Sequence, residues 1–131
     1  MTIVLIDDSR FLRTVNERTL AKAGYTVVTA ADGEEGLRMV SQHRPDLIIL
    51  DLMLPKVSGI DLLRAVRKDP ATATTPVMIL SSLSQRNEEK LVKEGATAYF
   101  EKAMLENSNG TVPFLNAVEQ LLRASKTKVR A

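Results

Sequence analysis

The sequence contains no cysteine and no tryptophan, and histidine occurs once among its 131 residues. The absence of cysteine excludes disulfide bonds, thiolate metal sites and cysteine nucleophiles, and it suits a reducing compartment. The single histidine, His43, stands just before Arg44-Pro45, near the end of a predicted helix. We expect it to be a solvated residue at the helix end rather than a relay group.

Long apolar runs are also missing. No stretch approaches the roughly 20 apolar residues that a membrane-spanning helix needs. The N-terminus passes from Met1 directly into an apolar segment, without a basic region or a small-residue cleavage site, so no secretory signal is predicted. We therefore expect a cytoplasmic protein that does not enter a membrane.

An excess of positive charge is found near the C-terminus. The formal net charge is +2, and residues 123–131 contribute four cationic side chains and no acidic one. A basic segment without aromatic residues is typical of a solvated chain end or linker. We expect no direct binding to nucleic acid.

Apolar runs and helical patterns alternate along the chain, and there is no internal repeat. The apolar runs predict strands, and apolar residues spaced three or four apart predict helices between them. Ser9 and Asp32 are predicted to cap the first two helices, and Gly24 and Pro45 to end them. The predicted strands are residues 2–7, 25–30, 47–51, 76–80 and 97–101, and the predicted helices are residues 9–23, 32–42, 60–68, 84–94 and about 114–122.

Five strand–helix units in succession predict one α/β domain, with a parallel sheet covered by helices on both faces. The first, third and fourth strands are the most continuously apolar, so they should be central, with the second and fifth at the edges. The strand order 2-1-3-4-5 satisfies this, and right-handed crossovers then decide which helices cover which face. The topological switch point, where open α/β sheets bind ligands, lies between the first and third strands.

Polar groups stand at the carboxyl ends of four of the five predicted strands: Asp7-Asp8, Asp51, Ser81 and Lys102. Taken singly, each aspartate is equally well explained as a cap of a turn or helix, and a serine or lysine there is ordinarily a loop residue. Three carboxylates converging in a partly buried site would repel one another, and a hard cation such as Mg²⁺ is one solution. The hydroxyl and ammonium groups are suited to phosphoryl oxygens, so the whole set favours phosphoryl transfer.

This set of residues, on five strand–helix units in this order, resembles the receiver domain of bacterial two-component response regulators. The resemblance covers residues 2–124. It implies the flavodoxin-like (βα)5 three-layer sandwich, whose strand order is also that of the chemotaxis member of the family. It further implies a receiver domain over residues 1–124, followed by a basic tail or linker remnant at residues 125–131.

The resemblance implies that Asp51 accepts a phosphoryl group from a phosphohistidine on a sensor histidine kinase or phosphotransfer protein. Asp8, Asp51 and the backbone carbonyl of Met53 would ligate Mg²⁺, with Mn²⁺ as a possible substitute. Asp7 would act mainly through a metal-bound water. Such a domain is not a turnover enzyme, because it assists only its own phosphorylation and loses the group slowly.

By the same resemblance, Ser81 and Lys102 would bind the phosphoryl oxygens, and Ser81 and Tyr99 would form the switch. The output surface would consist of the predicted helix 84–94, strand 97–101 and the last helix. Helix 84–94 has a weak apolar face, and loosely anchored elements are the ones such transitions move. The implied protein controls an unspecified effector, as a monomer or as a dimer formed on phosphorylation. Alternatively, Tyr99 is an edge-strand aromatic residue that packs on the last helix.

One position departs from the family pattern: Ala103 follows Lys102, where the family usually has proline. This departure keeps open a second function, a protein-interaction module of the same fold that works without phosphorylation. A third alternative is a Mg²⁺-dependent phosphatase with an aspartyl-phosphate intermediate. Those enzymes carry an Asp-x-Asp motif after the first strand, and Asp51-Leu52-Met53 lacks the second acid.

Overall fold

The computed structural model describes residues 1–52, 56–81, 92–101 and 111–130. Its middle layer is a parallel sheet of five strands, β1 (Thr2–Ile6), β2 (Thr26–Ala30), β3 (Leu47–Asp51), β4 (Val77–Ser81) and β5 (Ala98–Glu101). The strand order is β2-β1-β3-β4-β5, which confirms the predicted order and places β2 and β5 at the edges.

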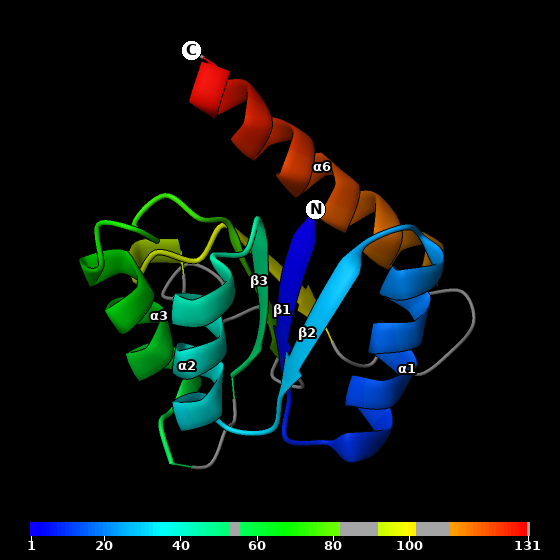
Figure 1. Cartoon of the computed structure of the whole chain (residues 1–131), viewed down its shortest axis with the longest axis horizontal. Helices are drawn as coiled ribbons and strands as arrows, with labels where there is room; N and C mark the ends of the chain where they lie inside the picture. Colours follow the sequence, from blue (N-terminus) through cyan, green and yellow to red (C-terminus); the bar gives the residue numbers. More distant parts are fainter. Residues whose placement is uncertain (53–55, 82–91, 102–110, 131) are drawn as a thin grey trace.

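Helices cover both faces of the sheet, so the molecule has three layers (Figure 1). One face carries α1 (Arg10–Lys22) and α6 (Thr111–Arg130), and the other carries α2 (Gly33–His43) and α3 (Gly59–Lys68). The predicted helix 84–94 lies mostly outside the described residues. Within the described part of the chain, no helix has the length and apolar character of a membrane span.

The core consists of two apolar clusters, one on each face of the sheet. Alternate residues of the central strands supply them: Val4, Ile48 and Ile79 point to the α2–α3 face, whereas Ile3, Ile49 and Met78 point to the α1–α6 face. Because both faces are covered, nearly every residue of these strands is buried, which explains their continuous apolar runs. The burial of these apolar strands thus places the carboxyl ends of β1 and β3 side by side at the switch point.

Each of the first three helices begins at a capping side chain. Ser9 Oγ accepts from the Leu12 backbone N–H (3.3 Å), Asp32 Oδ1 from that of Glu35 (2.8 Å) and Ser58 Oγ from that of Asp61 (3.2 Å). The caps at Ser9 and Asp32 are as predicted. The hydrogen bond from Glu35 is the main reason that the pKa of Asp32 lies below its ordinary value. These caps fix where the loops at the carboxyl edge of the sheet end.

Arg67, on the last turn of α3, holds together two connections that precede β4 and β5. Its guanidinium donates to the backbone carbonyls of Thr72, Ala73, Thr75 and Gly95, at 2.6–3.3 Å, and to the Thr97 hydroxyl at 3.3 Å. Partial burial lowers the pKa of this guanidinium from its ordinary value. The backbone carbonyls thus take the place of water around the charge.

The last helix is longer than its apolar pattern predicts. Its buried side chains, among those described, are Phe114, Val118 and Leu122, which lie four residues apart on one face. The helix continues to Arg130, so it includes most of the segment predicted to be a tail (Figure 1).

Candidate functional site

Three of the predicted site residues, Asp7, Asp8 and Asp51, come together at the carboxyl edge of the sheet. One carboxylate oxygen from each lies within 4.8 Å of the other two. Asp7 is fully buried and Asp51 is 3% exposed, whereas Asp8 is exposed to solvent. The cluster therefore has two buried acids and one open side.

The strand register explains why these residues meet. Asp51 is the last residue of β3, and Asp7 directly follows β1, its neighbour in the sheet. Ile6 pairs with Leu50, so the residues after each of them reach the same level. The convergence of Asp7 and Asp51 is thus a consequence of parallel pairing between the two central strands.

The turn that carries Asp7 and Asp8 is held at several points. The Asp7 backbone N–H donates to the Ala30 carbonyl of β2 (3.1 Å), and Asp7 Oδ1 accepts from the Ser9 N–H (2.9 Å). An Arg13 guanidinium nitrogen donates to the Asp7 carbonyl (2.8 Å). Arg13 could not be identified from the sequence, because an arginine on an amphipathic helix normally lies in solvent.

Leu52, which follows Asp51, lies close to the start of α3. The Gly59 N–H donates to the Leu52 carbonyl (3.1 Å). A Cβ on Gly59 would lie 2.7 Å from the Leu52 Cα and oxygen and 2.9 Å from the Asp51 oxygen. All three are backbone atoms, so only glycine allows α3 to approach the end of β3 this closely.

Lys56 and Val57, just before α3, lie against the start of α2. A Cβ on Gly33 would lie 2.3 Å from the Val57 carbonyl oxygen. Lys56 Nζ lies 3.6 Å from Asp32 Oδ2, and this ion pair also contributes to the lowered pKa of Asp32. The start of α2 therefore contacts Lys56 and Val57, the described residues just before α3.

The other predicted site residues are placed only in part. Ser81 is the last residue of β4, one position beyond Leu80, which pairs with Asp51. Its backbone thus lies next to the acidic cluster, at the expected edge. Met53 and Lys102, together with Ala103, lie outside the described residues.

Tyr99 and the next residue, Phe100, face opposite sides of the sheet. Tyr99 packs against the cluster on the α2–α3 face. Phe100 packs on Phe114 of α6, with ring centroids 5.6 Å apart and planes at 66°. The aromatic residue of β5 that packs on the last helix is therefore Phe100, contrary to the alternative expectation for Tyr99.

The segment before β5 is linked to α3 by an ion pair. Arg64 Nε and one terminal nitrogen donate to the two Glu94 carboxylate oxygens at 2.6 and 2.8 Å. The C-terminal end of the predicted helix 84–94 is therefore anchored, at Glu94, more firmly than its weak apolar face indicates. The sequence did not reveal this pair, because its members lie 30 residues apart.

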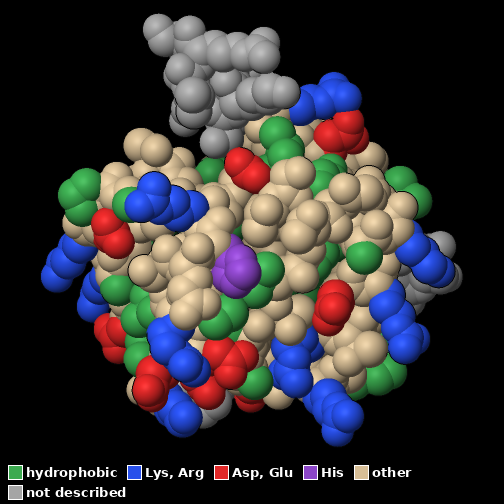
Figure 2. Space-filling view, viewed as in Figure 1, with side chains coloured by type: hydrophobic (Ala, Val, Ile, Leu, Met, Phe, Trp, Pro, Cys, Tyr) green, Lys and Arg blue, Asp and Glu red, His purple; other side chains and the backbone are tan. Residues whose placement is uncertain are grey.

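The donor set of the cluster suits a hard divalent cation. In an octahedron with metal–oxygen distances of about 2.1 Å, two ligand oxygens lie about 3–4 Å apart. The observed separations, within 4.8 Å, need little adjustment to reach this. His43 is not part of the cluster: it is the last residue of α2, at the opposite edge of the sheet, and it is exposed (Figure 2).

The sequence matches the family described as response regulator receiver domain over residues 3–108. It is 36% identical over 101 residues to the alkaline phosphatase synthesis transcriptional regulatory protein PhoP of Bacillus subtilis, covering 76% of this chain and 41% of PhoP. A protein-glutamate methylesterase/protein-glutamine glutaminase of Natronomonas pharaonis is 38% identical over 111 residues, which cover 82% of this chain and 30% of that enzyme. The chain thus spans less than half the length of these curated relatives.

Among solved structures, the chemotaxis protein CheY4 of Vibrio cholerae superposes with a TM-score of 0.81 at 30% sequence identity. The match covers 92% of this chain and 97% of that protein. This agreement extends the similarity from the sequence to the order and direction of all five strands.

Proposed function

Because this chain belongs to the family of response regulator receiver domains, we propose that it is the phosphoacceptor module of a two-component system, with Asp51 as the acceptor. The observation that carries the proposal is the position of Asp51. It ends a central strand, is 3% exposed, and lies within 4.8 Å of two further carboxylates. We propose the cytoplasm as its location.

The residues that would hold Mg²⁺ are Asp8 and Asp51, with the backbone carbonyl of Met53, and Asp7 through water. Mn²⁺, which accepts the same oxygen ligands, is the possible substitute. A divalent ion there supplies charge neutralisation, both for the three carboxylates and for the phosphoryl oxygens. Asp7, held by the Ser9 N–H, keeps the acidic turn in place.

Phosphoryl transfer to Asp51 is a single chemical step. A carboxylate oxygen of Asp51 attacks phosphorus as the phosphorus–nitrogen bond of the phosphohistidine breaks. The imidazole, protonated on its other nitrogen, leaves as a neutral ring, and an acyl phosphate is formed on Asp51. Ser81 and Lys102 would bind the phosphoryl oxygens, and such positioning supplies most of the catalysis in phosphoryl transfer.

The switch would follow from Ser81. A phosphoryl group on Asp51 offers its hydroxyl a charge-assisted hydrogen bond, which would draw the segment after β4 toward the site. We propose that Tyr99 responds, and that segment 84–94, β5 and α6 form the output surface. The Arg64–Glu94 ion pair would hold the end of this segment on α3.

We also propose how this module sits within its pathway. Residues 1–124 would form the receiver unit, and residues 125–131, partly included in α6, would serve as its tail or as a linker to an effector domain. The unit would act through an effector, as a monomer or a phosphorylation-dependent dimer. It would neither contact nucleic acid itself nor turn over a substrate.

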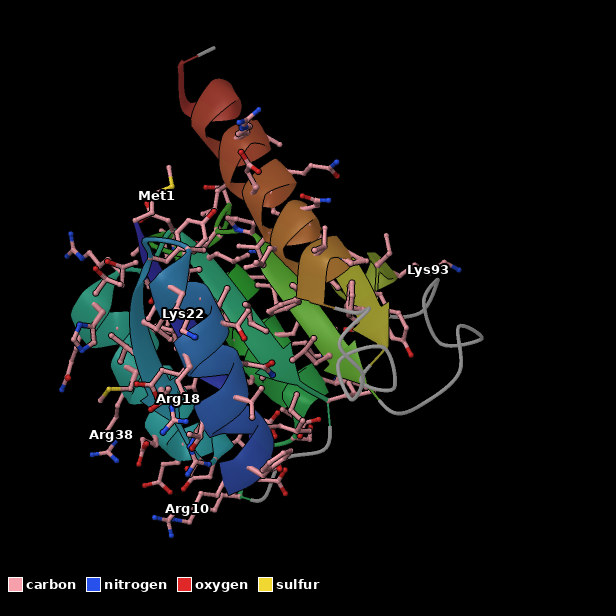
Figure 3. The ribbon with its side chains drawn as sticks, turned by 90° about the vertical axis from the view of Figure 1, so that its right-hand side faces the viewer. Met1, Arg10, Arg18, Lys22, Arg38 and Lys93 are labelled. Atoms are coloured by element: carbon pink, nitrogen blue, oxygen red, sulfur yellow. The ribbon has the colours of Figure 1, made fainter. Side chains whose placement is uncertain are left out.

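An exposed apolar stripe on α1 marks the side from which a protein donor would approach. Phe11 is 74% exposed and Val15 is 37% exposed, and they lie one turn apart on the helix that starts at the acidic turn. Arg18 and Lys22 lie on the same side of α1 as these two apolar residues, farther from the acidic turn (Figure 3). We propose that a helix of the donor, with apolar residues near its phosphohistidine and acidic residues beyond, docks here.

Phe11→Ala should slow phosphoryl transfer from a phosphorylated sensor kinase by tenfold or more, because central aromatic contacts often contribute about 2 kcal/mol to protein association. Labelling by acetyl phosphate, which needs no docking surface, should change by less than about twofold on the same basis. The measurement is the initial rate of transfer from each donor at subsaturating receiver concentration.

Val112→Ala is the matched control, since Val112 is 64% exposed but lies on α6. It should leave both rates unchanged. An equal loss with both donors would show that Phe11 acts on the chemistry rather than on docking, and an unchanged kinase rate would remove the stripe from the proposal.

The function is tested by incubating the chain with acetyl phosphate, with Mg²⁺ or with EDTA. We expect one phosphoryl group per chain, stable enough to be seen by intact-mass spectrometry, only when Mg²⁺ is present. No label under either condition would favour the phosphorylation-independent interaction module. Rapid release of phosphate over many turnovers would favour the phosphatase.

A further inference from the structure

Arg13 stands out among the cations of α1 because its charge is turned toward the acidic turn. It is half-buried, whereas Arg10, Arg18 and Lys22 on the same helix are exposed (Figure 3). Its guanidinium donates to the Asp7 carbonyl at 2.8 Å. A half-buried arginine bound to a backbone oxygen beside three carboxylates requires an explanation beyond solubility.

The hydrogen bond fixes the peptide that leads into Asp8. The C=O and N–H of a trans peptide point in opposite directions, so a fixed Asp7 carbonyl sets the whole plane. The other sides of Asp7 are held by Ala30 and Ser9. Asp8 is exposed, so the direction of its side chain depends mainly on the backbone that precedes it.

The acceptor of the Arg13 hydrogen bond is a backbone oxygen, not a carboxylate. Arg13 uses a backbone oxygen in this bond, so the bond itself occupies no carboxylate oxygen that a cation would need. Its positive charge also offsets part of the repulsion among the three acids. Arg13 therefore supports the cluster without taking its ligands.

We propose that Arg13 is a positioning residue for the divalent-cation site, and that it acts by holding the Asp7–Asp8 peptide so that Asp8 is directed toward Asp51. This inference rests on the proposed function, because it presumes that the cluster binds Mg²⁺. Groups that orient metal ligands typically change metal affinity by about 10–100-fold when they are removed.

Geometry and charge predict opposite results for Arg13→Ala. Removing a nearby cation alone should tighten Mg²⁺ binding by about two- to threefold, since the charge is partly screened by water. Losing the fixed peptide should weaken it by about tenfold. We expect the geometric effect to dominate, so that the Kd for Mg²⁺ rises by about tenfold.

The experiment is a calorimetric titration of Mg²⁺ into the metal-free chain, for the wild type, Arg13→Ala, Arg13→Lys and Arg10→Ala. Arg13→Lys keeps the charge and one donor, and its Kd should rise by no more than about threefold. Arg10→Ala removes the same charge from the adjacent turn without touching the Asp7 carbonyl, and its Kd should not rise. Thermal unfolding in EDTA separates a binding effect from a loss of fold.

Unchanged or tighter binding by Arg13→Ala would overturn the inference, and so would an equal weakening by Arg10→Ala. If Arg13→Ala does not fold, Arg13→Gln takes its place, with the same expected weakening and the same overturning result. If the wild type binds Mg²⁺ and Arg13→Ala binds it equally well, only this inference is overturned. A wild-type chain that binds no Mg²⁺ overturns it together with the metal site of the proposed function.

Discussion

Asp51→Asn should abolish phosphoryl labelling by acetyl phosphate. The asparagine side chain keeps the size of aspartate but has no anionic oxygen to attack phosphorus, and an amide cannot form the acyl phosphate. Asp51 is buried at the end of β3, so the strand itself fixes the position of its carboxylate. The check is the intact mass after incubation with acetyl phosphate and Mg²⁺, followed by hydroxylamine, which releases an acyl phosphate from the wild type.

Asp46→Asn is the control for this substitution. Asp46 stands at the start of β3, at the far edge of the sheet, where its carboxylate accepts from the Thr2 N–H (2.8 Å). This variant should be labelled like the wild type. Retained label in Asp51→Asn would move the acceptor role to another acid, with Asp7 and Asp8 as the first to examine.

Gly59→Ala should be the most damaging single-methyl change near the site. The added Cβ would lie 2.7–2.9 Å from backbone atoms of Leu52 and Asp51, which cannot rotate away. Overpacking of this kind costs about 1–3 kcal/mol, so the free energy of unfolding should fall by about 2 kcal/mol. The movement of α3 that relieves this clash should also displace Asp51. A displacement of about 1 Å typically costs about 100-fold in rate. Urea denaturation and the initial rate of labelling measure the two effects.

Gly36→Ala provides the comparison. A Cβ on Gly36 would lie 2.7 Å from Ile6 Cδ1 and 3.1 Å from Ile6 Cγ1 and Cγ2, which are side-chain atoms and can shift more easily than backbone. Alanine also favours a helix over glycine by about 1 kcal/mol, which offsets the contact. Its labelling rate should stay within about threefold of the wild type on this basis. A Gly59→Ala variant that behaves like Gly36→Ala would show that the start of α3 does not position Asp51.

Much of the fold was predictable because one physical signal dominates it. Strands buried on both faces must be continuously apolar, and this pattern identified β1, β3 and β4 as central. Once the order of the strands is known, parallel pairing brings Asp7 and Asp51 to one edge. Capping residues such as Ser9 and Asp32 were predictable for a similar reason, since the helix start itself requires them.

Contacts made by long polar side chains were not predictable. Arg13, Arg64 and Arg67 all sit on helices whose patterns explain them equally well as solvated residues. Most of their hydrogen-bond partners are backbone carbonyls, and Glu94, which pairs with Arg64, lies 30 residues away, so local sequence spacing does not indicate these contacts. The faces of Tyr99 and Phe100 were uncertain for another reason: alternation separates the two residues, but only the sheet decides which points to α6.

The length of α6 has a mechanical consequence. Its described buried residues end at Leu122, while the helix runs on to Arg130. The intervening arm is about 12 Å long at 1.5 Å per residue, and a tilt of about 10° around Leu122 would move its tip by about 2 Å. α6 is therefore built as a lever that pivots about Leu122: residues 111–122, about 17 Å long, rest on the sheet beside β5, and residues 122–130, about 12 Å long, carry any rotation of that part away from the sheet.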